Sequence, residues 1–296
     1  MKRYIILISV YNDWKSVTKL LDQIDVQTKN WSAEISVIIV NDASTEKRSG
    51  LDLNYKKIKL VKIINMKENR VHQRCIAAGL KYICKNEDFD WVILMDADGE
   101  DRPEELNNFY IKTQEKPNMT ITGNRFKRSE GVIFRLLYEI HKILTLIFTG
   151  KLIKFGNFSC LPKQHAMQLI EKSYLWNAYS SSVVKTIKDR TSIASIRGIR
   201  YVLPSKMNLF KLFFHSLTII SVFKNEVIMR SVIFLLVYLF IIYENISIVT
   251  ILPLFCLLLF VFIILKISQR GNMEEFEKSL ENIASIDILL DFNSRQ

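Results

Sequence analysis

Residues 91–104 read WVILMDADGEDRPE and combine an apolar run, an acidic loop and the start of a helix. Trp91–Met95 is continuously apolar, which is typical of a strand buried on both faces of a parallel sheet. Asp96 and Asp98 follow this run directly, and Pro103 suits the first turn of a helix. The stretch therefore predicts a buried strand that ends in two carboxylates and leads through a loop into a helix.

The same alternation of strand and helix runs through residues 1–125. The other strand-like segments are short apolar runs: Tyr4–Ser9, Ile35–Val40, Ile58–Ile64 and Met119–Thr122. The helix-like segments carry apolar residues at helical spacing: Asp13–Gln27, Arg70–Cys84 and Pro103–Thr113. Alternating elements with fully apolar strands predict an α/β fold with a mostly parallel sheet.

Polar residues follow three of the predicted strands, in Tyr11–Asp13, Asn41–Ser44 and Asp96–Asp98. Ligands of open α/β sheets bind outside the carboxyl ends of the strands, so these residues are expected to share one crevice. An acidic crevice repels a nucleotide diphosphate unless a divalent cation bridges the two, and Mg²⁺ or Mn²⁺ prefers such oxygen ligands. Asp13 and Asp42 also suit helix N-caps, a role that is compatible with binding.

The sequence lacks the motifs of several common classes of enzyme. It has no Walker A loop and no G-x-G-x-x-G, which argues against a P-loop ATPase and a dinucleotide-binding enzyme. It also has no H-E-x-x-H zinc motif and no G-x-S-x-G nucleophile elbow. Its cysteines stand apart from one another, as expected of reduced thiols in a cytosolic part: Cys75, Cys84, Cys160 and Cys256.

The net charge of +11 is concentrated in one part of the chain. Residues 120–230 contain 18 Lys and Arg but only 5 Asp and Glu, and they lead directly into the most apolar segment. Basic sequence beside a hydrophobic segment indicates a cytoplasmic membrane face or a phosphate-bearing partner. No nucleic-acid recognition motif accompanies it, so a nucleic-acid partner is not expected.

Two segments are long and apolar enough to predict a transmembrane hairpin. Ile246–Leu265 has 20 residues and no charge, and Glu226–Asn245 has charges only near its ends. Leu209–Phe223 is amphipathic and adjoins the hairpin, which favours a helix in the membrane interface. Ile133–Phe148 is also amphipathic, and its sequence fits an interfacial helix and a core helix equally well.

The positive-inside rule orients this hairpin. Lys and Arg flank its two outer ends, whereas the connection at Glu244-Asn245 carries neither. The α/β domain and both termini are therefore expected in the cytoplasm, in a protein that crosses the inner membrane more than once. The predicted units are an α/β domain, an amphipathic juxtamembrane helix, two transmembrane helices and a cytoplasmic tail: residues 1–205, 206–225, 226–267 and 268–296. Short helices such as Glu274–Leu290 are expected in the tail.

The chain resembles the family 2 glycosyltransferases of GT-A fold, and more narrowly the membrane-anchored polyprenyl-phosphate glycosyltransferases of the dolichol-phosphate mannose synthase type. The matching stretches extend from the first strand to the approach to the membrane: Ser9–Asp13, Val40–Glu46, Met95–Glu104, Gly123–Arg125, and Arg200 followed by Ser205–Met207. Ser9 stands where the family has Pro, and Asn41 replaces the first Asp of a pair. Glu100 and Arg102 replace Gln and Pro. Ser159 lies where many lipid-phosphate members carry Arg.

The resemblance implies an inverting, metal-dependent transferase with a nucleotide-sugar donor. It assigns Mg²⁺ or Mn²⁺ to Asp96, Asp98 and Glu100. It assigns donor binding to residues at the strand ends: Tyr11, Asn12, Asp13, Asp42, Ser44, Asp96 and Ala97. It assigns catalysis to Asp98 and to cations that would face phosphate groups: Arg125, Arg200 and Lys206.

The acceptor is expected to be a polyprenyl phosphate. A sugar hydroxyl must lose a proton to a general base, yet no Glu-Asp pair that could supply one occurs in residues 120–230. An anionic phosphate needs positive surroundings instead, which the basic stretch beside the lipid bilayer supplies. Two alternatives stay open: a transferase acting on a glycan hydroxyl in cell-surface polysaccharide synthesis, and a non-catalytic, membrane-tethered nucleotide-sugar binding protein. Assembly into a homo-oligomer also stays open.

Overall fold

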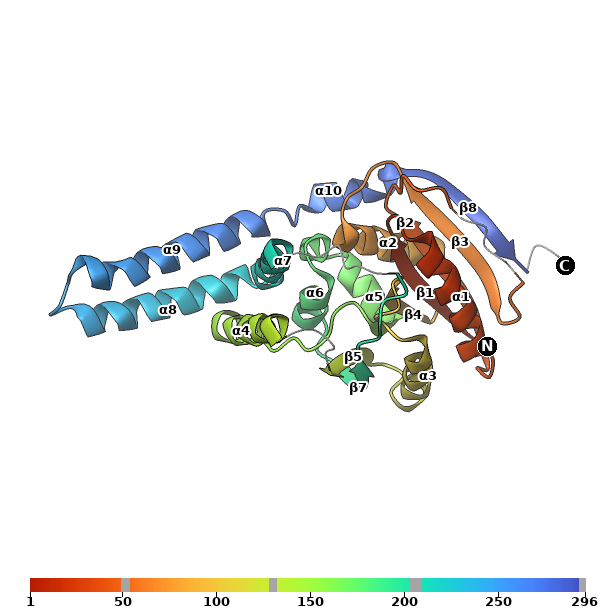
Figure 1. Cartoon of the computed structure of the whole chain (residues 1–296), viewed down its shortest axis with the longest axis horizontal. Helices are drawn as coiled ribbons and strands as arrows, with labels where there is room; N and C mark the ends of the chain where they lie inside the picture. The colour runs from red at the N-terminus through yellow and green to blue at the C-terminus, as the bar shows by residue number, and fades with distance from the viewer. Residues whose placement is uncertain (49–53, 128–131, 203–208, 293–296) are drawn as a thin grey trace.

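A computed structural model describes residues 1–48, 54–127, 132–202 and 209–292. Within these residues the centre of the molecule is an eight-stranded sheet in the order β7-β5-β6-β4-β1-β2-β3-β8 (Figure 1). The strands are β1 Lys2–Val10, β2 Ala33–Asn41, β3 Ile58–Met66, β4 Trp91–Asp96, β5 Thr120–Lys127, β6 Ser159–Pro162, β7 Arg190–Ile196 and β8 Ile283–Asp291.

The parallel strands of this sheet align their carboxyl ends. β1 is parallel to β2 and β4, with Ser9 opposite Asp96 and Val10 opposite Asn41. β2 is parallel to β3, and β5 to β7, whereas β6 and β8 run antiparallel to their neighbours. The register therefore brings the polar residues that follow β1, β2 and β4 to one edge of the sheet.

Helices cover both faces of the sheet. The helical segments are α1 Trp14–Thr28, α2 His72–Asn86, η1 Pro103–Glu105, α3 Leu106–Glu115, α4 Val132–Thr149, α5 Lys163–Ile170, η2 Ser173–Trp176, α6 Tyr179–Thr186, α7 Leu209–Ser221, α8 Lys224–Ile242, α9 Ile248–Ser268, α10 Met273–Glu277 and η3 Lys278–Asn282. α1 and α3 share one hydrophobic cluster with the sheet, and α2, α5 and α6 share another. Ile6 and Ile8 belong to the first cluster, whereas Ile5 and Leu7 belong to the second. Because both faces of β1 are buried, its sequence is continuously apolar.

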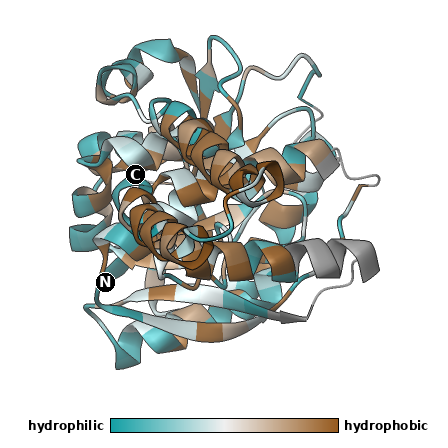
Figure 2. Cartoon of the chain, turned by 90° about the vertical axis from the view of Figure 1, so that its left-hand side faces the viewer, coloured by the Kyte–Doolittle hydropathy of each residue, from teal (hydrophilic) through white to brown (hydrophobic). Residues whose placement is uncertain are grey.

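The helices α8 and α9 form a hairpin that projects from the domain (Figure 1). Their most apolar windows have mean hydropathies of 2.0 and 3.2, and only 17% and 6% of those windows are buried. Figure 2 views the molecule from the hairpin side and shows its hydrophobic colour along both helices. Among the described residues, these two helices are long and apolar enough to cross a membrane by length and composition.

The helix α4 lies beside this hairpin. It packs against α8 and α7, and Phe148 contacts Phe234 and Phe260. Ile143 and Leu146 on the same helix are exposed. An exposed apolar face next to the hairpin favours the interfacial interpretation of this amphipathic segment over the core interpretation.

The prediction of a helix over Glu274–Leu290 is wrong for most of its length. The helix α10 ends at Glu277, and β8 pairs antiparallel with β3, with Ile286 opposite Ile64. The chain thus returns from the hairpin and adds the last strand to the sheet, so this segment is part of the domain. Ile283, Ile286 and Ile288 are β-branched residues that suit a strand, a preference that the helical spacing of the segment concealed.

Candidate active site

The acidic loop, Asp96–Asp101 at the end of β4, is shaped by a glycine and a buried carboxylate. Gly99 has φ +86°, and a Cβ at this position would lie 2.7 Å from the ring of Tyr201. Asp101 is only 1% exposed, and its Oδ2 accepts a hydrogen bond from the backbone N of Asp96 at 2.9 Å. Its Oδ1 pairs with Nη2 of Arg125, also at 2.9 Å. The predicted catalytic Arg125 therefore reaches the acidic loop, where it binds Asp101.

Two further arginines hold the carboxylates of this loop. Arg200 lies 2.8 Å from Oδ2 of Asp98 and donates from Nε to Oε1 of Glu100 at 2.7 Å. Arg197 pairs with the other oxygen of Glu100. The structure thus brings Asp98, Glu100 and Arg200 together as predicted, but it directs Glu100 to two guanidinium groups.

The charges of the loop shift the pKa values of its carboxyl groups. Burial, together with the charges of Asp96 and Glu100, raises the pKa of Asp98 to about 6. Burial and Asp96 raise the pKa of Asp101 to about 7. Burial alone would raise the pKa of Asp96, but the neighbouring His72 outweighs it and holds this pKa below its usual range. The loop therefore concentrates more negative charge than its environment readily stabilises.

This donor set fits a hard divalent cation. Among the described residues, no group of three or more His, Cys, Asp or Glu side chains gathers at metal-ligand geometry. Asp96 and Asp98 nevertheless supply carboxylate oxygens at a place where excess negative charge raises a pKa. Mg²⁺ is commonly held by one or two carboxylates plus substrate phosphates, so two protein ligands suffice. Glu100 is a weaker candidate because both of its oxygens bind arginines.

The loops after β1 and β2 are joined to each other by hydrogen bonds. Asn12 has φ +52°, and its Oδ1 accepts from the backbone N of Thr45 and Glu46 at 2.9 and 3.0 Å. Its own backbone N donates to Oγ of Ser44 at 2.9 Å. The predicted donor-binding residues Asn12 and Ser44 are thus brought together, and their side chains hold the two loops in place.

The other predicted donor-binding residues follow the carboxyl ends of the same strands. Asp42 is 3% exposed and accepts from the backbone N of Arg70 at 2.9 Å, and burial raises its pKa. Asp13 precedes α1 but makes no side-chain capping hydrogen bond, so the N-cap interpretation is not supported there. Tyr11 is exposed and Ala97 is buried. Lys206 lies outside the described residues.

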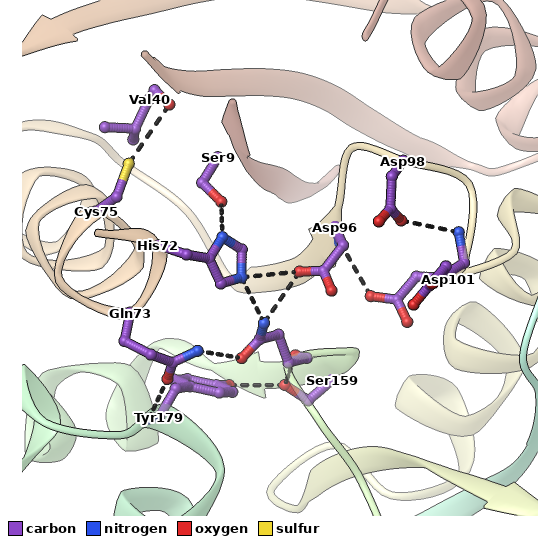
Figure 3. A network of polar contacts seen from close by, with 12 residues as sticks. Ser9, Val40, His72, Gln73, Cys75, Asp96, Asp98, Asp101, Ser159 and Tyr179 are labelled. Carbon is purple, nitrogen blue, oxygen red and sulfur yellow. Dashed lines mark hydrogen bonds and ion pairs between the residues drawn. The ribbon is translucent and has the colours of Figure 1, made fainter. Parts of the chain in front are cut away.

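A second set of polar residues completes the site and was not predicted. His72, Gln73 and Asn157 form hydrogen bonds beside Asp96 (Figure 3). They come from α2 and from the segment before β6, so no local motif links them to the acidic loop. Ser9, which stands where the family has Pro, was the sequence feature that could have indicated these residues. Its Oγ lies 2.8 Å from Nδ1 of His72.

Ser159 occupies the place of an expected arginine and lies in the interior of the domain. It is fully buried, and its Oγ lies 2.7 Å from the hydroxyl of Tyr179, which is also fully buried. The chain therefore has no cation at this position. Arg125 and Arg200 are the predicted cations that the structure does place beside the loop.

Comparison with known proteins agrees with this fold. The family model for Glycosyl transferase family 2 matches residues 5–178. Two curated relatives are undecaprenyl-phosphate 4-deoxy-4-formamido-L-arabinose transferases, from Photorhabdus laumondii and Salmonella choleraesuis. Each is 23% identical, over 58% of this chain and 51% of the relative. The chain therefore spans about half the length of the curated relatives it matches.

Solved structures share the architecture at low sequence identity. Mannosyl-3-phosphoglycerate synthase from Rubrobacter xylanophilus has a TM-score of 0.56 and 12% identity, over 77% of this chain and 75% of that chain. Glucosyl-3-phosphoglycerate synthase from Mycobacterium tuberculosis, in complex with Mn²⁺, UDP-glucose and phosphoglyceric acid, has a TM-score of 0.51 and 10% identity. That similarity covers 76% of this chain and 80% of the other. Both similarities concern the fold, an α/β GT-A domain.

Proposed function

The chain belongs to glycosyl transferase family 2, and from this premise we propose that it transfers a sugar from a nucleotide-diphosphate donor to a polyprenyl phosphate at the cytoplasmic face of a membrane. One observation carries the proposal. Asp98 of the acidic loop and the guanidinium of Arg200 pair at the carboxyl edge of the sheet, in a domain that continues into an apolar hairpin.

The donor would bind across the strand ends. Asp42 and Asp13 would accept hydrogen bonds from the base and ribose, as carboxylates readily do with N–H and hydroxyl groups. Asp96 and Asp98 would hold Mg²⁺ or Mn²⁺, which when bound neutralises the charge of the donor diphosphate. The relative from Mycobacterium tuberculosis binds Mn²⁺ together with its UDP-sugar, which supports this assignment.

The positions of the few acidic residues in the basic segment, residues 120–230, support an acceptor that needs no general base. Four of its five acids have described side chains: Glu139, Glu171, Asp189 and Glu226. Glu139 and Glu171 pair with lysines close to them in sequence, on α4 and after α5. Glu226 lies in the first turn of α8. Asp189 precedes β7 beside the start of β5, at the opposite edge of the sheet. Among the described residues, these four acids make no hydrogen bond or ion pair with the acidic loop.

The chemistry of the step follows from the charge of the acceptor. A phosphate oxygen would attack the anomeric carbon from the side opposite the diphosphate, so one C–O bond forms as another breaks and the anomeric configuration inverts. The phosphate is already an anion, so no proton has to be removed. Arg200 would stabilise negative charge that moves to the leaving diphosphate, because a guanidinium binds phosphate oxygens in a bidentate manner.

The curated relatives and the hairpin support a lipid acceptor. Both relatives are named as undecaprenyl-phosphate transferases. Lys224 and Arg230 lie at the start of the hairpin, and Lys266 and Arg270 at its end, where cations would meet anionic headgroups. A polyprenyl phosphate held at this boundary would present its phosphate to the domain.

The test is a transfer assay on the purified full chain with a panel of labelled nucleotide-sugars and Mg²⁺ or Mn²⁺. We expect label in added undecaprenyl phosphate, the acceptor for which the curated relatives are named. We expect Asp98→Asn to lower the rate at least about a hundredfold, because it removes a ligand charge from the cation. Full turnover by Asp98→Asn would refute the mechanism. Label found only in a glycan would favour the hydroxyl-acceptor alternative, and donor binding without any transfer would favour a non-catalytic binding protein.

A further inference from the structure

His72 is the point at which three separate segments meet beside Asp96. It opens α2, its side chain is 42% exposed, and both ring nitrogens have partners (Figure 3). Nδ1 lies 2.8 Å from Oγ of Ser9 near the end of β1. Nε2 lies 3.1 Å from Oδ1 of Asp96 and 2.8 Å from Nδ2 of Asn157. The ring therefore connects the first strand to the acidic loop.

The direction of these hydrogen bonds is set by the backbone N–H of Tyr179, which lies at the end of this hydrogen-bond network. The backbone N–H of Tyr179 can only donate, and it donates to Oε1 of Gln73 at 2.8 Å. Gln73 must then present its Nε2 to Oδ1 of Asn157, at 3.3 Å. The amide of Asn157 is thereby oriented with its Nδ2 toward His72 and Asp96.

The two hydrogens of this Nδ2 account for the remaining contacts. One is donated to Oδ1 of Asp96 at 3.0 Å, and the other points at Nε2 of His72 at 2.8 Å. A neutral His72 accepts there and donates from Nδ1 to Ser9. A ring that carries a second proton would instead donate from Nε2 to Asp96. In the neutral state the ring acts on Oδ1 of Asp96 through Asn157, and in the protonated state it binds the same oxygen directly.

The backbone before His72 is strained in a way that favours this placement. Val71 has φ +74°, an uncommon conformation for a β-branched residue. Such strain persists where the surrounding structure overdetermines it, and it is concentrated at functional sites. The strained turn directly precedes α2, whose first residue His72 contacts Ser9, Asp96 and Asn157.

We propose that His72 is a positioning residue for Asp96. It fixes Asn157 and with it Oδ1 of Asp96, which would leave the other oxygen of this carboxylate to hold the divalent cation. The inference rests on the proposed assignment of the cation to Asp96. It also explains Ser9, because a proline at that position has no hydroxyl to bind Nδ1.

The test measures Mn²⁺ binding to the full chain in detergent, with and without uridine diphosphate, by the loss of the free Mn²⁺ signal in electron paramagnetic resonance. Glutamine places an amide near the position of Nε2, whereas asparagine reaches only the position of Nδ1. We expect His72→Ala and His72→Asn to raise the Mn²⁺ Kd by about 10- to 100-fold, and His72→Gln to stay within about threefold of the unsubstituted chain.

Asn86→Ala is the matched control, because Asn86 lies at the other end of α2 and its side chain donates to Tyr82 O. The control should leave the Kd unchanged, and thermal unfolding without Mn²⁺ reports any loss of folding in each variant. An unchanged Kd in His72→Ala, or a Kd for His72→Gln as weak as that for His72→Ala, would overturn the inference.

Transfer activity measured in parallel separates this inference from the proposed function. A chain that binds Mn²⁺ in a manner dependent on His72 but transfers no sugar would refute the function and support the inference. A chain that binds no Mn²⁺ would refute the assignment of the cation to Asp96, and the inference with it.

Discussion

At the residue scale, the shape of the acidic loop depends on Asp101. Its two oxygens bind the backbone of Asp96 and the guanidinium of Arg125, each at 2.9 Å, and the residue is buried. Sequence alone assigned Arg125 to a phosphate group. In the structure, the guanidinium of Arg125 compensates the charge of the buried Asp101 carboxylate. Any contact of Arg125 with a substrate would come from this guanidinium, which Asp101 already orients.

Arg125→Gln tests this structural role. Removing one partner of a buried ion pair leaves the other charge uncompensated, and we expect the free energy of unfolding to fall by about 3 kcal/mol. Chemical denaturation followed by tryptophan fluorescence measures the change. The double variant Asp101→Asn/Arg125→Gln should recover part of the loss, because no buried charge remains unpaired. A double variant as unstable as the sum of both single variants would contradict the pairing.

The predicted elements of the domain are confirmed where their sequence pattern is local. β1, β2, β3, β4, α1 and α2 begin and end within about two residues of the predicted segments, as expected of boundaries read from pattern alone. β6, β7 and β8 were missed. β6 has only four residues, and β8 carries apolar spacing that also fits a helix, so its pairing with β3 is a long-range choice.

At the scale of elements, a buried lysine anchors the returning segment to the domain. Lys81 on α2 is 1% exposed, and its Nζ donates to the carbonyl groups of Phe276 and Glu277 at 2.8 and 2.9 Å. It also pairs with the Glu277 carboxylate at 2.9 Å. The hairpin is therefore followed by a segment that is bound to the same helix whose first residue contacts Asp96.

Lys81→Met is expected to loosen this segment. The carbonyl groups of α10 would lose a buried donor, at a cost of about 1–3 kcal/mol. Limited proteolysis should then cut residues 269–282 faster than in the unsubstituted chain. Lys85→Met is the control, because Lys85 is half exposed and lies 3.9 Å from Glu277. Equal cleavage rates for the two variants would show that Lys81 does not anchor the segment.

At the scale of the whole molecule, the charged and apolar regions are separated along the long axis. The acidic loop lies in the domain at the edge of the sheet, whereas the hairpin projects from one end (Figure 1). Cations stand where the hairpin joins the domain, and the connection at Glu244-Asn245 has none. This distribution supports the proposal that the hairpin enters and leaves the membrane from the cytoplasmic side.

The proposed orientation predicts a pattern of chemical labelling. In a variant whose four cysteines are replaced by serine, we expect Asn245→Cys to react with a membrane-impermeant maleimide in intact cells. Lys2→Cys should react only after the membrane is permeabilised, because the positive-inside rule places the domain in the cytoplasm. The reverse pattern would refute the orientation, and labelling at both positions in intact cells would show that the hairpin does not span the membrane.

The amino-acid sequence by itself determined the family, the α/β class of the domain, the hairpin and the acidic loop. Each of these rests on residues that are adjacent or regularly spaced in the chain: apolar runs, a long uncharged segment, and Asp96 to Asp98 after a buried strand. Tertiary structure alone decided which cations bind which carboxylates, that His72 and Asn157 stand beside Asp96, and that the last strand joins the sheet. The physical reason is that these contacts join residues tens to hundreds of positions apart. Their partners are chosen by strand register and helix packing, which no local pattern encodes.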